Sequence, residues 1–275
     1  MSGVRWVLVA GVAIGAAAGP LRAGPYADEV GLHKTDASIH AWATGYTDLV
    51  RGPQDASVES SPPASFGTGD NTLGEPGDVF DTVSLGDGGR ITLSFATPIG
   101  DGPGADFAVF ENAFIDASTG GLFAELAHVE VSSDGVNFFR FPSVSLTPTT
   151  TQVGTFGSID PTDVHNLAGK SAIDTGTPFD LSDLLSLPGA AAGLNVYDVT
   201  HVRVIDAIGS VDPSLGTRDG LGSLINDAFT TPFSNGGFDL NAIGVLHEAI
   251  PGDANFDRQV NALDLSIVAS NWLGA

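Results

Sequence analysis

Oxygen-bearing side chains recur near the C-terminus at a spacing that suits a bound cation. They occupy positions 1, 3, 5, 9 and 12 of the stretch 253–264, and position 7 can offer its backbone carbonyl. A loop of this length and spacing can wrap a hard divalent cation, which takes about six to eight oxygen ligands. The sequence therefore predicts a calcium site at Asp253, Asn255, Asp257, Gln259, Asn261 and Asp264.

A short apolar helix is expected directly after this loop. Leu263, Ile267, Val268 and Trp272 recur at spacings that place them on one stripe of a helix. Val260, at position 8, is expected to point into the loop. We predict that calcium folds an otherwise disordered acidic tail and so presents the helix stripe to a partner or to the body. An ordinary acidic turn without a cation is the alternative interpretation.

The loop and its helix resemble one half of a dockerin repeat. This resemblance implies that Gln259 supplies its carbonyl and that the side-chain ligands are Asp253, Asn255, Asp257, Asn261 and Asp264. Position 6, where the family prefers glycine, is Arg258, which must adopt a left-handed conformation or distort the loop at a cost of about 1 kcal/mol. We find one copy, where a cohesin-docking dockerin normally has two, and Ala262 and Leu263 stand where hydroxyls are common. A structural or attachment segment is therefore favoured, with a cohesin-like or surface-matrix protein as candidate partner.

The sequence lacks the motifs of common enzymes. It has no Gly-x-Ser-x-Gly elbow, no His-Glu-x-x-His and no phosphate-binding loop, and the absence of cysteine excludes thiol chemistry. We therefore expect a non-catalytic protein. Glycoside hydrolysis needs only two carboxylates at a suitable separation, so four residues on or beside predicted strands stay open as candidates: Asp106, Glu111, Glu125 and Glu130.

A second calcium site is a further hypothesis for the body of the protein. An ion there would order long loops rich in Asp and Gly without disulfides. The residues that flank these loops and carry suitable oxygens are Asp106, Glu111, Asn112, Asp206 and Asp239.

Aromatic side chains bear on an alternative function, which is a carbohydrate-binding module or a glycoside-hydrolase-associated protein targeted to polysaccharide. Exposed strand aromatics would form a platform for a glycan. Phenylalanine in strands is usually buried, so we expect packing in the core for Phe107, Phe110, Phe138 and Phe139.

The body, residues 24–250, is expected to be an all-β domain. From Arg90 onward, apolar and polar residues alternate with the period of two that marks a half-buried strand. Short strands joined by Gly- and Asp-rich loops, without alternating helices, favour an antiparallel β-sandwich. Similar runs occur at 105–111, 126–132, 136–141, 201–206 and 238–247, with a tight hairpin at 133–135.

Few helices are expected in this body. Asp36 is placed to cap a short helix over 36–49, and Asp180 or Ser182 to cap one turn before Pro188. Long loops in a compact domain are usually functional or ordered by something bound. The long connections are 51–78, 142–200 and 207–237.

Several phrases of residues 30–248 carry a resemblance to a known family. They are VSLGDGGRITLSF, PIGDGPGADFAVFENAF, AELAHVEVSSDGVNFFRFP, HVRVIDAIG and NGGFDLNAIGV. This pattern resembles exported bacterial cell-surface proteins of the PEP-CTERM and planctomycete type, which implies export and a surface location. The role that we expect for such a protein is adhesion or scaffolding. The hairpin EVSSDGVNFFRF also looks like that of discoidin-like, galactose-binding domains, which implies a jelly-roll-like sandwich.

The N-terminal segment is typical of a signal peptide. Arg5 precedes an apolar run, and small residues offer cleavage after Ala18 or Ala23. Residues 1–23 are therefore predicted to direct the protein to secretion or the cell surface. An uncleaved anchor is disfavoured because the apolar run is shorter than the ~20 residues of a spanning helix. No later run is long enough, so we expect no transmembrane span after cleavage.

Charge and composition narrow the choice of partners. The 275 residues carry a net charge of −23, from 10 Lys and Arg against 33 Asp and Glu. A surface this negative repels phosphate backbones, so nucleic acid is not expected as a partner. Without cysteine, an exported protein must draw its stability from a large core, from bound ions or from both. Calcium is the expected partner, with residues 251–275 as a separate calcium-binding module.

Overall fold

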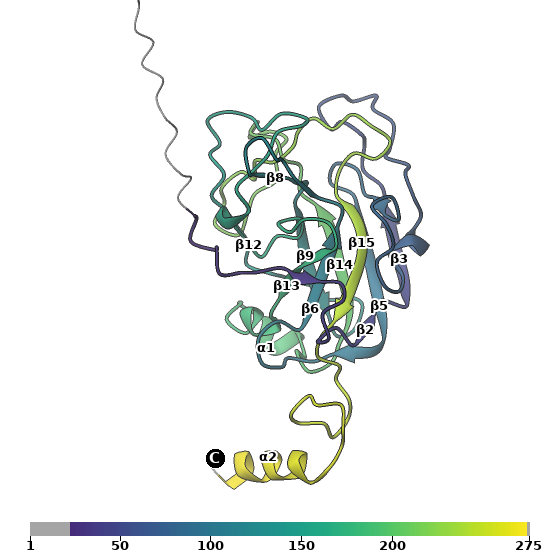
Figure 1. Cartoon of the computed structure of the whole chain (residues 1–275), viewed down its shortest axis with the longest axis vertical. Helices are drawn as coiled ribbons and strands as arrows, with labels where there is room; N and C mark the ends of the chain where they lie inside the picture. The colour runs from purple at the N-terminus through teal and green to yellow at the C-terminus, as the bar shows by residue number, and fades with distance from the viewer. Residues whose placement is uncertain (1–22, 274–275) are drawn as a thin grey trace, which may run out of the picture.

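Residues 23–273 are described by the structure, which is a computed structural model. Two curled antiparallel sheets form the body in the arrangement of a β-sandwich, and the C-terminal segment extends from one end of it (Figure 1). The all-β antiparallel body is thus confirmed. The predicted signal peptide, residues 1–23, lies outside the described residues except for Ala23.

The first sheet has six strands and carries the N-terminal segment at its edge. Its order is β1–β13–β6–β15–β2, and β4 also pairs with β15. Every pairing in it is antiparallel. The strands are β1 (Leu32–His33), β2 (Ala41–Trp42), β4 (Val83–Ser84), β6 (Phe107–Glu111), β13 (Thr175–Phe179) and β15 (Asp239–Val245).

The second sheet has five strands in the order β10–β9–β14–β5–β3. These are β3 (Gly45–Val50), β5 (Arg90–Ile99), β9 (Ala127–Ser132), β10 (Phe139–Arg140) and β14 (Val199–Asp206). Two small two-stranded sheets lie outside the sandwich: β7 (Phe114–Ile115) with β8 (Leu122–Phe123), and β11 (Val144–Ser145) with β12 (Val164–His165).

The main core lies between the two large sheets. Alternate residues of both sheets meet there, such as Leu93 of β5, Val204 of β14 and Ile243 of β15, all fully buried. Phe107 stacks on Phe179 at 5.4 Å between ring centroids. Burial of apolar side chains on both inner faces explains why the period-two pattern predicted these strands correctly.

The strand phenylalanines divide into two groups. Phe107 and Phe110 are buried as expected, at 0% and 1% exposure. Phe138 and Phe139 are only partly buried, because they lie at the β9–β10 hairpin rather than between the sheets. The guanidinium of Arg203 covers the Phe138 ring, 3.5 Å from its centroid, so this ring is not an open platform for a sugar.

The prediction of a helix over 36–49 is wrong, because this segment forms the strands β2 and β3 instead. The Asp36 carboxylate accepts hydrogen bonds from the backbone N–H and hydroxyl of Ser38, which closes a local turn and caps no helix. Trp42 pairs with Gly244 of β15, and Tyr46 pairs with Leu93 of β5. Pairing with two separate sheets therefore overrides the local helical pattern.

The prediction of one capped helical turn near Asp180 is confirmed, but the expected long connection 142–200 also contains the strands β11, β12 and β13. Asp180 caps η3 (Leu181–Leu184), which is one turn of 3₁₀ helix, by accepting a hydrogen bond from the Ser182 backbone N–H. A second such turn, η1 (Gly69–Thr72), lies in the first long loop, η2 (Pro161–Asp163) precedes β12, and α1 is one turn (Ala190–Gly193). Residues 133–135 lie in the link from β9 to β10, but this link spans 133–138 and is therefore longer than the tight hairpin expected. β10 covers only two residues of the expected 136–141.

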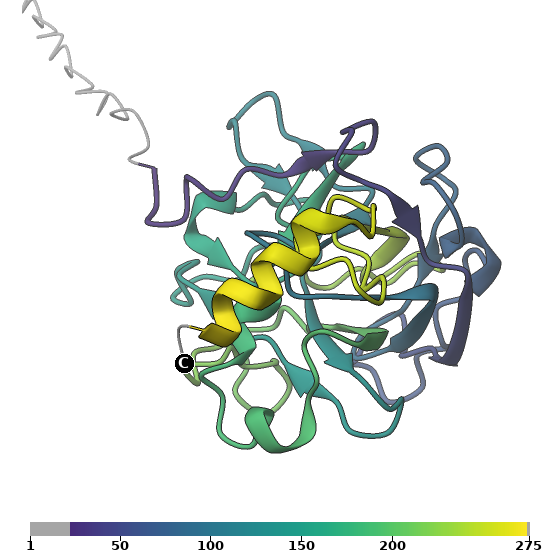
Figure 2. The ribbon, with the colours of Figure 1, turned by 90° about the horizontal axis from the view of Figure 1, so that it is seen from below.

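The C-terminal helix α2 (Ala262–Leu273) is the longest helix among the described residues. Figure 2 views the molecule from the end of the sandwich that carries this helix, and α2 runs across it. Within residues 23–273, no helix is both long enough and apolar enough to cross a membrane.

Candidate functional site

The predicted calcium loop is closed by the carboxylates at its first and last positions. Asp264 accepts hydrogen bonds from the backbone N–H groups of Ala254, at 2.9 Å, and Asn261, at 2.7 Å. Asp253 accepts one from the backbone N–H of Arg258 at 2.7 Å. Both carboxylate-bearing residues are buried, at 6% and 2% exposure, although they belong to a terminal segment. The loop thus folds around its two outermost predicted ligands.

The other four predicted ligands lie nearer to the solvent. Asn255 is half-buried, while Asp257, Gln259 and Asn261 are exposed. Local bonds tie them together: the Asp257 carboxylate accepts the backbone N–H of Gln259 at 2.8 Å, and the Asn255 amide donates to Asp257 at 3.0 Å. Backbone N–H bonds, led by that of Asn261, hold the pKa of Asp264 below its usual range, so this carboxylate stays charged.

Two details of the loop test the sequence analysis. Arg258 adopts a left-handed backbone with φ of 64°, as its place at position 6 predicts. Val260 is 61% exposed, so the expectation that it points inward is wrong. Val260 lies near Gly252, where an added Cβ would come within 3.0 Å of the valine side chain.

The loop is docked on the sandwich. The ring of Phe256 packs on His247 with 5.3 Å between centroids. It also lies against Gly100, where an added Cβ would come within 2.8 Å of the ring, so a side chain at this position would displace it. The Arg258 guanidinium pairs with Glu248 at 3.0 Å. These contacts hold the module in place while α2 keeps apolar side chains exposed.

The predicted apolar stripe of α2 is not covered by the body. Leu263 is 60% exposed and Val268 is 52% exposed, and Leu265 on another face is 69% exposed. Ile267 is half-buried. The side chain of Trp272 lies outside the described residues. A run of exposed apolar side chains on a helix with a single charged residue suits contact with another molecule.

A second set of carboxylates is buried where the two sheets meet the long loops. Glu111 ends β6, Asp206 ends β14 and Asp239 begins β15, so four of the five residues of the hypothesised second calcium site lie at one end of the sandwich. Among the described residues, however, the three carboxylates whose oxygens all lie within 4.8 Å of one another are Asp101, Asp106 and Asp180. The fourth residue of the hypothesised site at that end, Asn112, donates its amide to Asp239 at 3.2 Å. Asp106 lies at the opposite end of β6 and does not belong to this group.

Each carboxylate in this buried group is held by backbone or side-chain donors. Asp206 joins the two sheets by accepting the N–H groups of Gly88, at 2.8 Å, and Phe238, at 2.7 Å. The sequence analysis did not place Glu125 and Asp227 in this group. Glu125 accepts the N–H of Gly237 at 3.0 Å, and Asp227 that of Leu126 at 2.7 Å. Their place beside Asp206 depends on loop packing, for which the sequence gives no local signal.

Burial dominates the electrostatics of the buried group. It raises the pKa of Asp206 to about 8 and that of Asp239 to about 6, and neighbouring carboxylates add to the shift of Asp206. Burial also raises the pKa of Glu111 and Glu125 well above the usual range, with Asp239 as the next cause for both. Such a group must hold protons or a cation at neutral pH.

Arg51 is a cation that lowers the pKa of Asp239. Its guanidinium is already engaged with backbone carbonyls, at 2.8 Å from that of Phe66 and 2.6 Å from those of Ser84 and Gly67. Arg51 therefore offsets only part of the negative charge.

Glu111 and Glu125 do not form an accessible catalytic pair for glycoside hydrolysis, because their side chains are buried, at 3% and 7% exposure.

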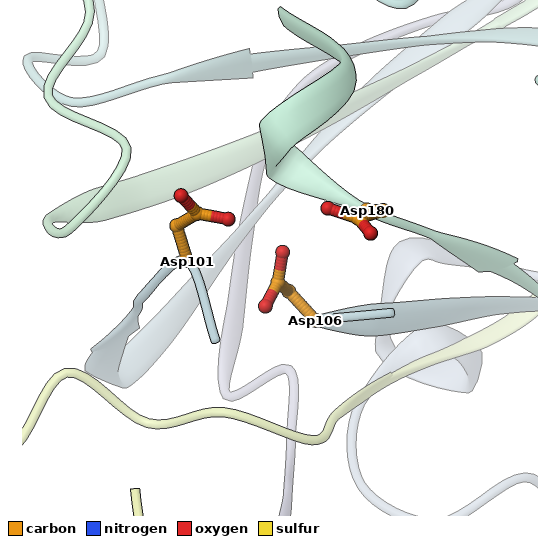
Figure 3. Close-up of side chains that lie close together, drawn as sticks. All are labelled: Asp101, Asp106 and Asp180. Atoms are coloured by element: carbon orange, nitrogen blue, oxygen red, sulfur yellow. The ribbon is translucent and has the colours of Figure 1, made fainter. Parts of the chain in front are cut away.

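A third cluster joins three aspartates at the other end of β6. One carboxylate oxygen from each of Asp101, Asp106 and Asp180 lies within 4.8 Å of the others (Figure 3). Asp106 is fully buried and pairs with Nδ1 of His247 at 2.8 Å. Burial raises the pKa of Asp101 to about 6, and Asp106 and Asp180 add to the shift. Antiparallel pairing of β13 with β6 brings Asp180 to Asp106.

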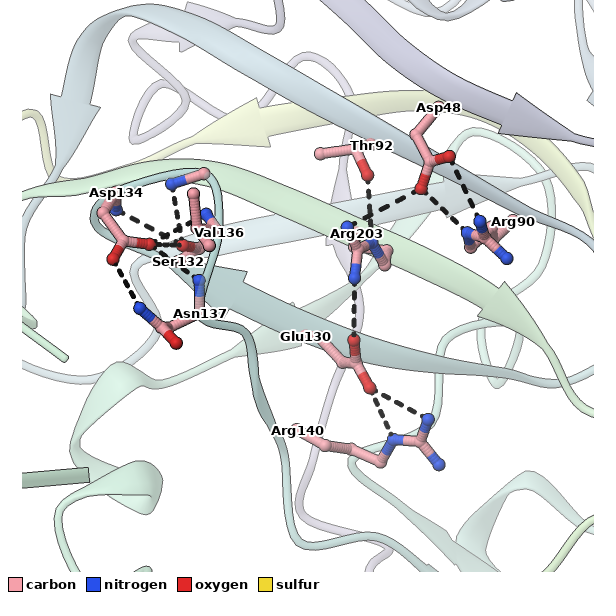
Figure 4. A network of polar contacts seen from close by, with 11 residues as sticks. Asp48, Arg90, Thr92, Glu130, Ser132, Asp134, Val136, Asn137, Arg140 and Arg203 are labelled. Carbon is pink, nitrogen blue, oxygen red and sulfur yellow. Dashed lines mark hydrogen bonds and ion pairs between the residues drawn. The ribbon is translucent and has the colours of Figure 1, made fainter. Parts of the chain in front are cut away.

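Of the other two carboxylates considered for hydrolysis, Asp106 is fully buried, and Glu130 belongs to a surface network on the five-stranded sheet (Figure 4). Glu130 pairs with Arg140 at 2.9 Å and with Arg203 at 3.7 Å. Arg203 also lies 3.6 Å from Asp48. Glu130 is thus neutralised by two arginines on an open strand face, which is a structural role rather than a catalytic one.

No family model, no curated protein and no solved structure matches this chain.

Proposed function

We propose that this chain is an exported cell-surface protein with an adhesion or scaffolding role, in which a jelly-roll-like sandwich carries a calcium-binding attachment segment. The segment resembles half a dockerin repeat. Its ligands would be the side chains of Asp253, Asn255, Asp257, Asn261 and Asp264 and the carbonyl of Gln259. The partner that α2 would contact is a cohesin-like or surface-matrix protein.

One observation carries this proposal: the carboxylates at loop positions 1 and 12 are buried inside a tail whose other loop residues are largely exposed. Two carboxylates enclosed by one short loop repel each other, and a divalent cation bound by both would remove that repulsion. The donor set of carboxylate, amide and carbonyl oxygens is the one that hard cations such as Ca²⁺ prefer.

Calcium binding by the tail can be measured by isothermal titration of the full chain. We expect a single tail site with a Kd of about 10⁻⁴ M, the range of extracellular calcium modules. Replacing Asp253 and Asp264 together by Ala should abolish this site, because it removes two of three carboxylate ligands. Unchanged heat in the double variant would contradict the assignment.

Arg258→Gly provides a matched comparison in the same titration. This variant keeps all six ligands and removes the left-handed strain at position 6, which is about 1 kcal/mol and corresponds to roughly fivefold in Kd. It loses only the half-exposed ion pair with Glu248. Binding that is equal to or up to fivefold tighter than in the wild type is expected.

Carbohydrate binding is the second candidate function, and one observation favours it. Pairs of stacked phenylalanines lie at the surface: Phe114, 52% exposed, with Phe123, and Phe156, 77% exposed, with Phe233. Exposed aromatic faces can stack on sugar rings. A glycan array probed with the mature protein distinguishes this function from passive attachment, because only a carbohydrate-binding protein gives a selective signal that falls in Phe156→Ala.

A further inference from the structure

A groove of about 540 Å³ lies on the outer side of the six-stranded sheet, between the N-terminal segment and the turn that follows β13. Its floor is apolar and comes from four separate parts of the chain: Leu32, Ala105, Pro178 and Leu246. Three of these residues, Leu32, Ala105 and Leu246, belong to the apolar cluster on this outer face. The groove therefore has a firm apolar base built on the sheet.

The rim of the groove carries negative charge. Asp28, Glu29, Asp180 and Asp183 line it together with His165 and His247, and no lysine or arginine does. Glu29 is already neutralised, because it pairs with Lys170 at 2.7 Å and with His165 at 2.6 Å. Across the described part of the chain, the other three carboxylates have no lysine, arginine or histidine within 4.0 Å.

Two of these free carboxylates are fixed in place before any ligand arrives. Asp183 accepts a hydrogen bond from the side-chain amide of Asn166 at 2.9 Å. Asp180 accepts the backbone N–H of Ser182 at 2.9 Å as the cap of η3. Neutral donors hold them without cancelling their charge, which is the arrangement of a preorganised cation-binding rim.

We propose that this groove binds a small organic cation with an apolar body, such as a protonated alkylamine. The ammonium group complements the charge of Asp28, Asp180 and Asp183, and the alkyl chain covers the apolar floor. An anionic ligand would meet the uncompensated carboxylates. A hydrated metal ion would leave the floor in contact with water, so it fits the groove less well. His247 lines this groove and also packs on Phe256 of the calcium loop, but none of the six predicted calcium ligands lines it.

Titration of the full chain with three six-carbon probes tests the proposal. We expect hexylammonium to bind with a millimolar Kd, and hexan-1-ol and hexanoate to bind at least tenfold more weakly, because only the first carries a positive charge. Raising NaCl to 0.5 M should weaken hexylammonium binding. Equal binding of hexylammonium and hexan-1-ol, or no binding of hexylammonium, would overturn the proposal.

Charge-matched variants locate the site. Asp28→Asn with Asp183→Asn removes two rim charges while keeping side-chain oxygens, and should weaken hexylammonium binding at least tenfold. The control removes two charges elsewhere, by Glu59→Gln with Asp70→Asn, because both residues are exposed and outside the groove. It should change the Kd by less than twofold. Equal weakening of hexylammonium binding in both double variants would show a general effect of charge and would overturn the proposed site. The comparison of probes on the wild type stays decisive if a variant fails to fold.

Discussion

Between pH 5 and pH 8, the calcium-free protein is expected to lose about 4 kcal/mol of its free energy of unfolding through Asp206 alone. The folded protein keeps the Asp206 proton up to a pKa of about 8, whereas the unfolded chain releases it near pH 4. The folded state therefore binds more protons than the unfolded state throughout this interval. Stability from this group is complete below about pH 4 and is lost as the pH rises through 8.

Urea unfolding in EDTA at pH 5, 6, 7 and 8 measures this dependence. The Asp206→Asn variant removes this titration and retains an oxygen that can accept one of the two N–H bonds. The decline of its free energy of unfolding with rising pH should therefore be shallower than that of the wild type by about 1.4 kcal/mol per pH unit. Asp239, with a pKa raised to about 6, adds a smaller loss in the lower half of the range. A wild-type free energy of unfolding that is flat or rises with pH would contradict the uncompensated burial of this group.

Replacing Phe107 by Ala is expected to lower the free energy of unfolding by about 3–5 kcal/mol. The ring is fully buried and packs on Phe179 at 5.4 Å and on Phe141 at 5.9 Å. Its removal leaves a cavity between the two sheets, which the well-packed neighbours cannot fill. Chemical denaturation at a fixed pH measures the loss.

Phe156→Ala is the matched control for this substitution. It removes the same side chain from a position that is 77% exposed, and surface substitutions of this kind change stability by about 0.5 kcal/mol or less. A comparable loss in both variants would mean that the phenylalanines of the strands are not the core that the fold assigns to them.

The sequence predicted the strands well where burial alternates. In β5 and β14, alternating side chains such as Ile91 and Leu93, and Val202 and Val204, enter the core, so the period of two predicts these parts of the strands. The prediction of a helix over 36–49 was wrong because the apolar residues of this segment are divided between two sheets. Trp42 pairs with a strand about 200 residues away, and Tyr46 pairs with one about 50 residues away. Local pattern cannot contain that information.

The candidate sites also differ in how much of each could be predicted from the sequence. The proposed calcium loop is contiguous, so its candidate ligands could be named from spacing alone. The left-handed backbone of Arg258 is one of the two alternatives that the resemblance to a dockerin loop implied. The cluster of Asp101, Asp106 and Asp180 could not, because it exists only through the pairing of β13 with β6. The buried group was predicted in part, since Glu111 and Asp239 flank visible strands, whereas Asp227 lies in a long loop.

The central claim is that the loop at 253–264 binds calcium, and the position of the ion tests it most directly. Crystals grown with CaCl₂ and measured at a long wavelength would give anomalous difference density at each calcium ion. The account predicts a peak inside the loop, within about 2.3–2.6 Å of oxygens from Asp253 and Asp264. A calcium-saturated crystal with no peak in the loop, whether or not one occurs elsewhere in the protein, would contradict it.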